Sequence, residues 1–253
     1  QVFKNPTGYD LGKPEKFIMP DALLEVSGIT FNNDSLYAVQ DEEGELFCLQ
    51  PGDKKAGSSK FGKKGDYEDL TIINGQVIIL RSDGTLFSFP FAESRLQETT
   101  ATKEWNDLVP KGEYEGLYAD AADNKIYVLC KQCKKEKGAL YILQLQPDGS
   151  IAQSGNASVN EEDILQLSGE KKLNFHPSAL AKNPRTQEWY ILSSANNMLV
   201  VADNAWKVKE VFPLDPALFR QPEGIAFDSQ NNLYISNEGD KVSNGNVLKF
   251  VFK

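Results

Sequence analysis

The sequence predicts an all-β fold, a five-bladed β-propeller built from four-stranded antiparallel blades, and three observations predict it. First, a short motif recurs that pairs two polar or acidic residues at spacing two before a small or acidic residue and an aliphatic one. Its five copies are Glu25–Ile29, Asp66–Leu70, Glu113–Leu117, His176–Leu180 and Gln221–Ile225. Second, the copies are 41, 47, 63 and 45 residues apart, and apart from the long interval these spacings match a blade of roughly 40–50 residues. Third, short apolar runs and turn residues alternate after every copy.

Each repeat contains the same succession of strands and turns. The first strand follows the motif, as in Ile29–Phe31, and ends at a turn such as Asn74-Gly75. Second strands, rich in β-branched and aromatic residues, follow at 36–39, 77–80, 126–129, 189–192 and 233–236. Third strands follow at 45–49, 85–89, 139–143, 198–201 and 247–250. A fourth, outer strand is clear in some repeats, as at Val208–Phe212, and this succession is typical of a propeller blade.

The N-terminal segment is expected to complete the last blade. The chain ends at Lys253 before the last repeat can form an outer strand, whereas Phe17–Leu24 resembles the outer-strand segment Phe212–Leu218. An N-terminal strand in the last blade would close the ring and leave only short, protected edges. We therefore expect one propeller domain over residues 1–253. The polar segment Ser150–Lys172 reads as an insertion with one short helix near Asn160–Leu167, and a sixth blade within it is the alternative.

Composition limits the kinds of partner. The chain has 253 residues and a formal net charge of −9. Nucleic-acid binding needs a basic face, so no nucleic-acid partner is expected. An acidic balance suits cation binding or simple solubility. No apolar run approaches the roughly 18 residues that cross a bilayer, and we expect a monomer.

The cysteines and the chain start carry less information. Cys130 and Cys133 form a C-x-x-C without the companion ligands of a zinc site, so a local disulfide or free thiols are expected. The charge run Lys134–Lys137 is typical of a solvated hairpin tip. The chain starts at Gln1 without a methionine, like a processed or truncated protein, so a signal peptide and a lipid anchor are expected to be missing from it.

Blade geometry should gather the motifs at one mouth of the central channel, because the connections into first strands and those between second and third strands emerge on the same face. Spacing two keeps both polar residues of a motif on one side of an extended chain. One column is Ser27, Glu68, Glu115, Ser178 and Glu223. A second column is Glu25, Asp66, Glu113, His176 and Gln221. The residues after the second strands add a third column, Asp41, Arg81, Lys131, Ser194 and Glu238.

These columns predict a metal site. They contain eight carboxylates and only two cations. Like charges that converge must take up protons, bind cations or point into water. Hard oxygen ligands on irregular loops suit calcium best, followed by magnesium or manganese. We expect the ligands among Glu68, Glu115 and Glu223, with Glu25 as a further candidate, so the ion should lie away from the two serines of the first column.

Two readings without a metal stay open. The two cations could neutralise some glutamates in a purely structural network, or the mouth could simply be solvated. The single histidine, His176, is a candidate general base or ligand, and a hydrogen-bonded structural role is the alternative.

At these residues the sequence resembles the SdiA-regulated family of bacterial proteins. The resemblance rests on segments that span nearly the whole chain, namely Glu25–Ile29, Asp41-Glu42, Gly65–Glu68, Glu113–Leu117, Pro177-Ser178, Leu192–Ser194, Glu223–Ile225 and Glu238. It implies a five-bladed propeller with a calcium site, distantly similar to NHL-repeat propellers, in the periplasm or on the cell surface of bacteria. Arg81-Ser82 and Cys130-Lys131 depart from the acidic residues that the family often has after the second strand.

Two main functions from different classes follow from the residues and these similarities, and a metal-free scaffold that binds proteins at its rim is a third alternative. The first is a calcium-binding propeller of the bacterial envelope that binds a small-molecule or protein ligand at its acidic mouth. The second rests on a more distant similarity to the calcium-dependent lactonase and phosphotriesterase propellers, and is a metal-dependent hydrolase of esters, lactones or phosphoesters. In that case His176 or a carboxylate would handle protons.

Overall fold

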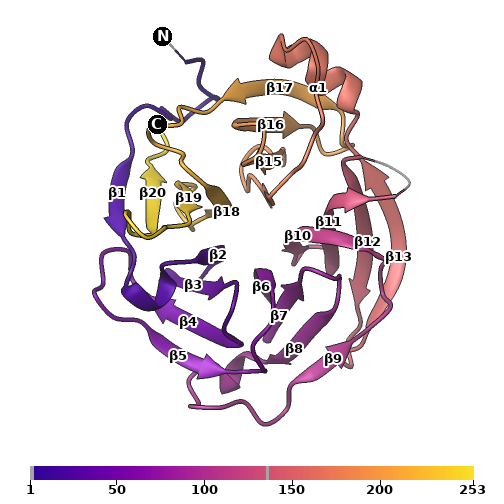
Figure 1. Cartoon of the computed structure of the whole chain (residues 1–253). Helices are drawn as coiled ribbons and strands as arrows, with labels where there is room; N and C mark the ends of the chain where they lie inside the picture. Colours follow the sequence, from indigo (N-terminus) through magenta and orange to yellow (C-terminus); the bar gives the residue numbers. More distant parts are fainter. Residues whose placement is uncertain (1–2, 135–136) are drawn as a thin grey trace.

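The computed structural model describes residues 3–134 and 137–253 and shows five antiparallel sheets arranged around a central axis (Figure 1). Each sheet has four strands, so the prediction of a five-bladed propeller with four-stranded blades is confirmed. Two residues of the expected hairpin tip, Lys135 and Glu136, lie outside the described residues.

The strands of each blade follow one another outward from the axis. The first blade contains β2 (Val26–Asn32), β3 (Ser35–Gln40), β4 (Glu45–Leu49) and β5 (Gly57–Lys60). The second contains β6 (Tyr67–Ile73), β7 (Gln76–Arg81), β8 (Leu86–Pro90) and β9 (Lys103–Trp105). The third contains β10 (Gly112–Asp120), β11 (Lys125–Cys133), β12 (Ala139–Leu145) and β13 (Ile151–Ser158). The fourth contains β14 (Ala179–Lys182), β15 (Trp189–Ser193), β16 (Met198–Ala202) and β17 (Val208–Pro213).

The last blade is shared between the two ends of the chain. It contains β18 (Pro222–Phe227), β19 (Leu233–Asn237), β20 (Asn246–Phe250) and, outermost, the N-terminal strand β1 (Glu15–Ile18). β1 pairs antiparallel with β20, with Phe17 opposite Val247. The predicted closure of the ring is therefore confirmed, and Glu25, directly before β2, ends the segment that leads from the last blade into the first.

The segment between the third and fourth blades does not form a sixth blade. Its strand β13 pairs with β12 as the outer strand of the third blade, and the rest forms helix α1 (Glu161–Ser168). Asn160 caps this helix by accepting a hydrogen bond from the backbone N–H of Asp163, and Gly169 ends it in the left-handed conformation. The alternative of six blades is wrong because the segment supplies one strand and a helix, and α1 packs against β17.

Two short 3₁₀ helices, η1 (Asp21–Leu23) and η2 (Phe91–Glu93), complete the described helical structure. None of the helices in residues 3–134 and 137–253 is long and apolar enough to cross a membrane.

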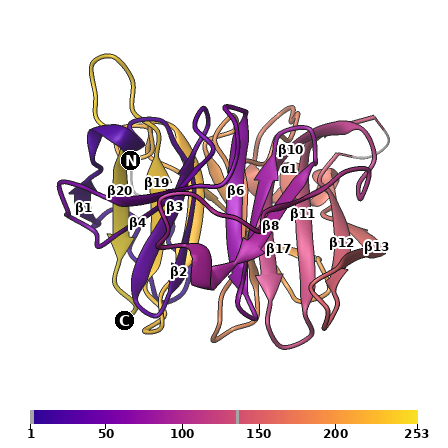
Figure 2. The ribbon, with the colours of Figure 1, turned by 90° about the horizontal axis from the view of Figure 1, so that it is seen from below.

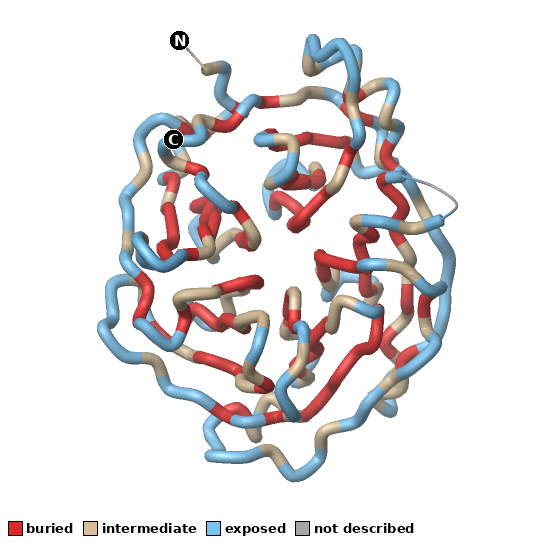
Figure 3. Tube along the Cα trace, viewed as in Figure 1, coloured by how far each residue is buried: buried red, intermediate tan, exposed pale blue. Residues whose placement is uncertain are grey.

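The core lies between neighbouring blades, where strands are buried on both faces (Figure 3). Every residue of β15 and of β19 is buried, for example. The five first strands contact one another in a ring around the axis. Seen from the side, the loop between β19 and β20 projects from one face and the C-terminus lies at the opposite face (Figure 2). This packed ring is a rigid support for loops at either mouth of the channel.

Cys130 and Cys133 form a disulfide at the end of β11, which is one of the two states expected for the C-x-x-C. Cys48 is a free thiol.

Candidate metal centre

The loops into the first strands and the loops after the second strands meet at one mouth of the channel. Backbone hydrogen bonds join residues of the second and third columns. The N–H of Asp41 donates to the carbonyl of Glu25 over 3.3 Å, and the N–H of Glu238 donates to the carbonyl of Gln221 over 2.9 Å. The backbone thus fixes the loops that carry the acidic residues.

The first column is positioned by β-bulges. The strand register shifts on either side of Ser27, Glu68, Glu115 and Glu223, so each of these residues has no direct partner on the second strand. A bulge bends the strand and turns the extra side chain in a new direction. Simple alternation along an extended chain, which the sequence suggested, is therefore not what orients these side chains.

The two serines of the first column join blades. The hydroxyl of Ser27 donates to the carbonyl of Tyr67 in the second blade over 2.8 Å. The hydroxyl of Ser178 donates to the carbonyl of Pro222 in the last blade over 3.1 Å and accepts a bond from the N–H of Ser194. Both serines are buried, so their hydroxyl groups satisfy backbone groups between blades.

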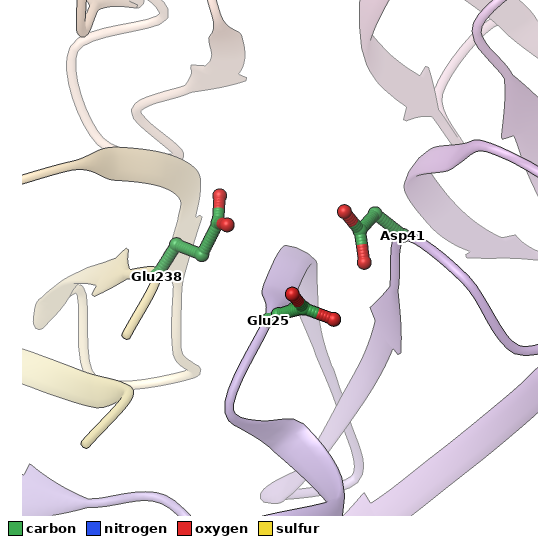
Figure 4. A group of neighbouring side chains, drawn as sticks. All are labelled: Glu25, Asp41 and Glu238. Atoms are coloured by element: carbon green, nitrogen blue, oxygen red, sulfur yellow. The ribbon is translucent and has the colours of Figure 1, made fainter. Parts of the chain in front are cut away.

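Three carboxylates from three loops form a cluster that we call the outer trio, namely Glu25, Asp41 and Glu238. One oxygen from each lies within 4.8 Å of the others. Figure 4 shows the side chains of Asp41 and Glu238 facing each other across a gap, with Glu25 between them. The Nε2 of Gln221 donates to Glu238 over 2.6 Å, whereas Oδ1 of Asp41 is buried without a hydrogen-bond partner.

Electrostatics in the outer trio favours bound protons or a cation. Burial, then the charges of Glu25, Glu42 and Asp66, raise the pKa of Asp41 to about 6. Burial, then the charges of Asp41, Glu25 and Glu115, raise the pKa of Glu238 to about 7. Burial and mutual repulsion therefore both disfavour the ionised forms of Asp41 and Glu238, and a divalent cation would offset both effects.

A second group, the inner cluster, consists of Glu68, Glu115, Glu223 and Lys131. The ammonium of Lys131 lies 2.6 Å from Oε1 of Glu115, whose side chain is only 6% exposed. Burial raises the pKa of both Glu68 and Glu115, but hydrogen bonds from Lys131 and Glu68 oppose the rise at Glu115. Burial and the charges of Glu115 and Glu238 raise the pKa of Glu223 to about 8. The ionised form of Glu115 is therefore balanced mainly by Lys131.

Asp69 also lies among these acids and was missed by sequence reasoning. Its carboxylate accepts the N–H of Leu70 and, across to the third blade, the N–H of Leu117, both over 2.8 Å. It is fully buried, and burial raises its pKa well above the usual range. One signal could have revealed it, because Asp69 stands where the other four motifs have glycine or alanine.

The other site residues predicted from the sequence are exposed or pair with residues outside the outer trio. Asp66 and Glu113 are exposed, although Glu113 approaches Lys131 to 3.5 Å. Arg81 pairs with Asp83 in its own hairpin over 2.8 Å, so that cation balances a turn residue. The ring of His176 contacts Asn174 over 2.7 Å, and among the described residues no carboxylate forms a hydrogen bond to that ring. His176 thus has the surroundings of a hydrogen-bonded structural residue.

A cavity of about 460 Å³ opens at the opposite mouth, between the far ends of the first strands. Phe31, Tyr118 and Phe227 line it, and Lys182 pairs there with Asp120 over 3.0 Å. None of its lining residues belongs to the outer trio or the inner cluster. The acidic mouth, with its clustered oxygen donors, is therefore the better candidate for metal chemistry.

The outer trio fits a hard cation. Its donors are carboxylate oxygens, which calcium prefers, and the buried oxygen of Asp41 lacks any partner within the protein. Buried polar atoms are usually paired, so an unpartnered oxygen on a carboxylate that lies beside two others is consistent with a ligand for an ion. Glu25, Asp41 and Glu238 would hold that ion.

Solved structures similar to this chain are also propellers. Glutaminyl cyclase from Myxococcus xanthus matches with a TM-score of 0.64 at 15% identity, over 94% of this chain and 95% of the other. Regucalcin, a calcium-binding protein from Agrobacterium tumefaciens, matches with a TM-score of 0.58 at 11% identity, over 94% and 95%. At such identities the similarity shows the fold alone. No curated protein sequence matches the chain.

The motifs that line the mouth are those on which the family resemblance rests, and the family profile agrees with them. It matches residues 15–241, from β1 to the loop that follows Glu238. Since this range covers most of the sequence, the chain belongs to the SdiA-regulated family.

Proposed function

We propose that this protein binds one calcium ion at the outer trio and uses it to bind a small-molecule or protein ligand at the acidic mouth. The observation that carries the proposal is the convergence of three carboxylates, one of which, Asp41, has a buried oxygen without a hydrogen-bond partner. A bound calcium ion would supply positive charge and open coordination positions for oxygen atoms of a ligand. The calcium-binding regucalcin, which shares the fold, supports the choice of ion.

The ligands proposed here differ from the set expected from the sequence. Glu25 is common to both, whereas Glu68, Glu115 and Glu223 lie with Lys131, whose ammonium already contacts Glu115. That earlier set stays a prediction. We favour the outer trio because its carboxylates have no internal cation within salt-bridge distance in the described part of the chain.

A metal-dependent hydrolase is the second candidate, and one observation favours it. Glu223 has a pKa of about 8, and a carboxyl group that titrates near neutral pH suits general acid–base catalysis. His176, the other candidate for proton transfer, is bound to Asn174. Hydrolysis of ester, lactone and phosphoester substrates, measured with and without a chelator, separates this function from binding alone.

We further propose that the protein works in the bacterial envelope. The disulfide between Cys130 and Cys133 supports an oxidising compartment such as the periplasm. Cell fractionation and thiol labelling of the native protein test this location, and a cytoplasmic protein with two free thiols would contradict it.

Calcium binding by the purified protein tests the main proposal. Equilibrium dialysis should show one ion per molecule, and Asp41→Asn should weaken its affinity by roughly tenfold or more, because a charged ligand is lost. Glu42→Gln is the matched control, since Glu42 is an exposed neighbour on the same loop and outside the trio. Absence of calcium binding by the wild type, or equal effects of the two substitutions, would contradict the proposal.

A further inference from the structure

Lys131 contributes a positive charge to the inner cluster. Its ammonium contacts Glu115 at 2.6 Å and Glu113 at 3.5 Å, and its side chain is about one-third exposed. Burial opposes its charge, but the hydrogen bond to Glu115 and the charges of Glu115, Glu113 and Glu223 outweigh burial and raise its pKa. The lysine is therefore fully charged where several carboxyl groups converge.

Three features of the fold fix the position of Lys131 beside Glu115. Lys131 lies within the second strand of its blade, β11, at the repeat position that corresponds to Asp41 and Glu238, which directly follow the second strands of the first and last blades. It also lies within the loop of the Cys130–Cys133 disulfide, which constrains the end of β11. Opposite it, the bulge in β10 leaves Glu115 unpaired in the strand register. Equivalent positions thus supply carboxylates to the outer trio and an ammonium to the inner cluster.

The inner cluster otherwise has the chemistry of a cation site. Glu68, Glu115 and Glu223 offer only carboxylate oxygens, and burial and the neighbouring Glu115 raise the pKa of Glu68. Glu115 is only 5% exposed, so its charge requires a close partner. In the described structure that partner is Lys131.

We propose that Lys131 sets the number of ions that the mouth binds, because its ammonium takes the place of a second divalent cation among Glu68, Glu115 and Glu223. This inference builds on the calcium site proposed at the outer trio, but it concerns a different set of residues. Removal of the ammonium converts the inner cluster into a second site for a hard divalent cation. Lys131 thus determines how many divalent ions each protein molecule binds.

The test counts calcium ions per molecule in Lys131→Met by equilibrium dialysis and elemental analysis. The variant is expected to bind one more ion than the wild type, and its melting temperature should rise more on calcium addition. Lys131→Arg keeps the charge and should bind no additional ion. Lys125→Met is the matched control, because Lys125 begins the same strand, carries the same charge and pairs with Asp123 instead. The double variant Lys131→Met/Glu115→Gln should lose the additional ion.

The outcomes separate this inference from the proposed function. An additional ion in Lys131→Met supports the inference even if the wild type binds none, a result that would reject only the outer-trio site. An unchanged number of ions overturns the inference and leaves the outer-trio site standing. If Lys131→Met unfolds without calcium, refolding on calcium addition supports the inference, whereas a protein that stays unfolded with excess calcium overturns it.

Discussion

At the scale of single residues, the first column of the mouth contains two kinds of side chain with different tasks. The hydroxyl groups of Ser27 and Ser178 donate hydrogen bonds to backbone carbonyls of the next blade. Glu68, Glu115 and Glu223 stand at matching positions in the other blades and present carboxylates instead. A single repeat position thus stabilises the ring in two blades and carries charge in three.

Ser27→Ala should therefore affect stability and leave calcium binding unchanged. It removes the single O–H donor that the carbonyl of Tyr67 at 2.8 Å and that of Val39 at 3.2 Å share, which should lower the free energy of unfolding by about 1–3 kcal/mol. Urea unfolding measures this loss, and Ser154→Ala, at an exposed serine on β13, is the control. A variant as stable as the control that has lost calcium binding would show instead that Ser27 is a ligand.

Asp69→Asn should destabilise the junction between the second and third blades. The carboxylate accepts two backbone N–H groups, whereas an amide has one oxygen and would leave one buried N–H facing an NH₂ group. We expect a loss of about 1–3 kcal/mol, and a melting temperature lower by roughly 2–4 °C for each kcal/mol. An unchanged melting temperature by calorimetry would show that a protein carbonyl or water replaces the lost acceptor.

At the scale of elements, the repeated motif is a bulged start to a first strand. The small residue after the bulge lets the next first strand approach. At Gly28, a Cβ would overlap Oδ1 of Asp69 and lie 2.6 Å from its Cα. The sequence shows the small residue and the pair of polar residues, but a bulge depends on the register with a partner strand. For this reason the orientation of Glu68, Glu115 and Glu223 could not be predicted.

Gly28→Ala should lower stability because β2 and β6 would have to separate. We expect a cost of about 1–3 kcal/mol, as for overpacking of a tight core. Gly155→Ala is the control, since a Cβ at Gly155 meets nothing within 4 Å. Chemical denaturation of both variants is the measurement, and equal midpoints would mean that the two strands can move apart without loss.

At the scale of the whole molecule, the sequence predicted the ring and its closure well. Short runs of apolar, β-branched and aromatic residues between turn residues predicted the strands, and the similarity of Phe17–Leu24 to Phe212–Leu218 predicted that β1 completes the last blade. The structure of residues 150–172 was harder to predict, because a polar segment of this length can form a helix and an outer strand as easily as a short blade. All three residues of the outer trio were expected at the mouth, but their grouping depends on side-chain directions at the junction of the first and last blades.

Stability without metal should fall as pH rises through the neutral range. Asp41, Glu238 and Glu223 have folded-state pKa values of about 6, 7 and 8, all above those of unfolded carboxyl groups. The folded state therefore binds more protons, and the stability that these protons confer is lost as pH rises from about 5 to about 8. Calcium replaces the protons, so the calcium-induced rise in melting temperature should grow over the same range.

Thermal unfolding in chelator and in calcium, at several pH values between 5 and 8, measures this effect. Asp41→Asn should flatten the decrease in chelator because it removes one of the three titrating groups. A melting temperature that stays constant or increases with pH in chelator would contradict the assigned directions of the pKa shifts.

The central claim is that a calcium ion binds at the outer trio, and the position of that ion can be observed directly. Crystals grown with calcium, measured at a long wavelength, would give an anomalous difference peak at the ion. The predicted peak lies between Glu25, Asp41 and Glu238, at about 2.3–2.6 Å from their carboxylate oxygens. An empty trio, or a peak only among Glu68, Glu115 and Glu223, would contradict the claim.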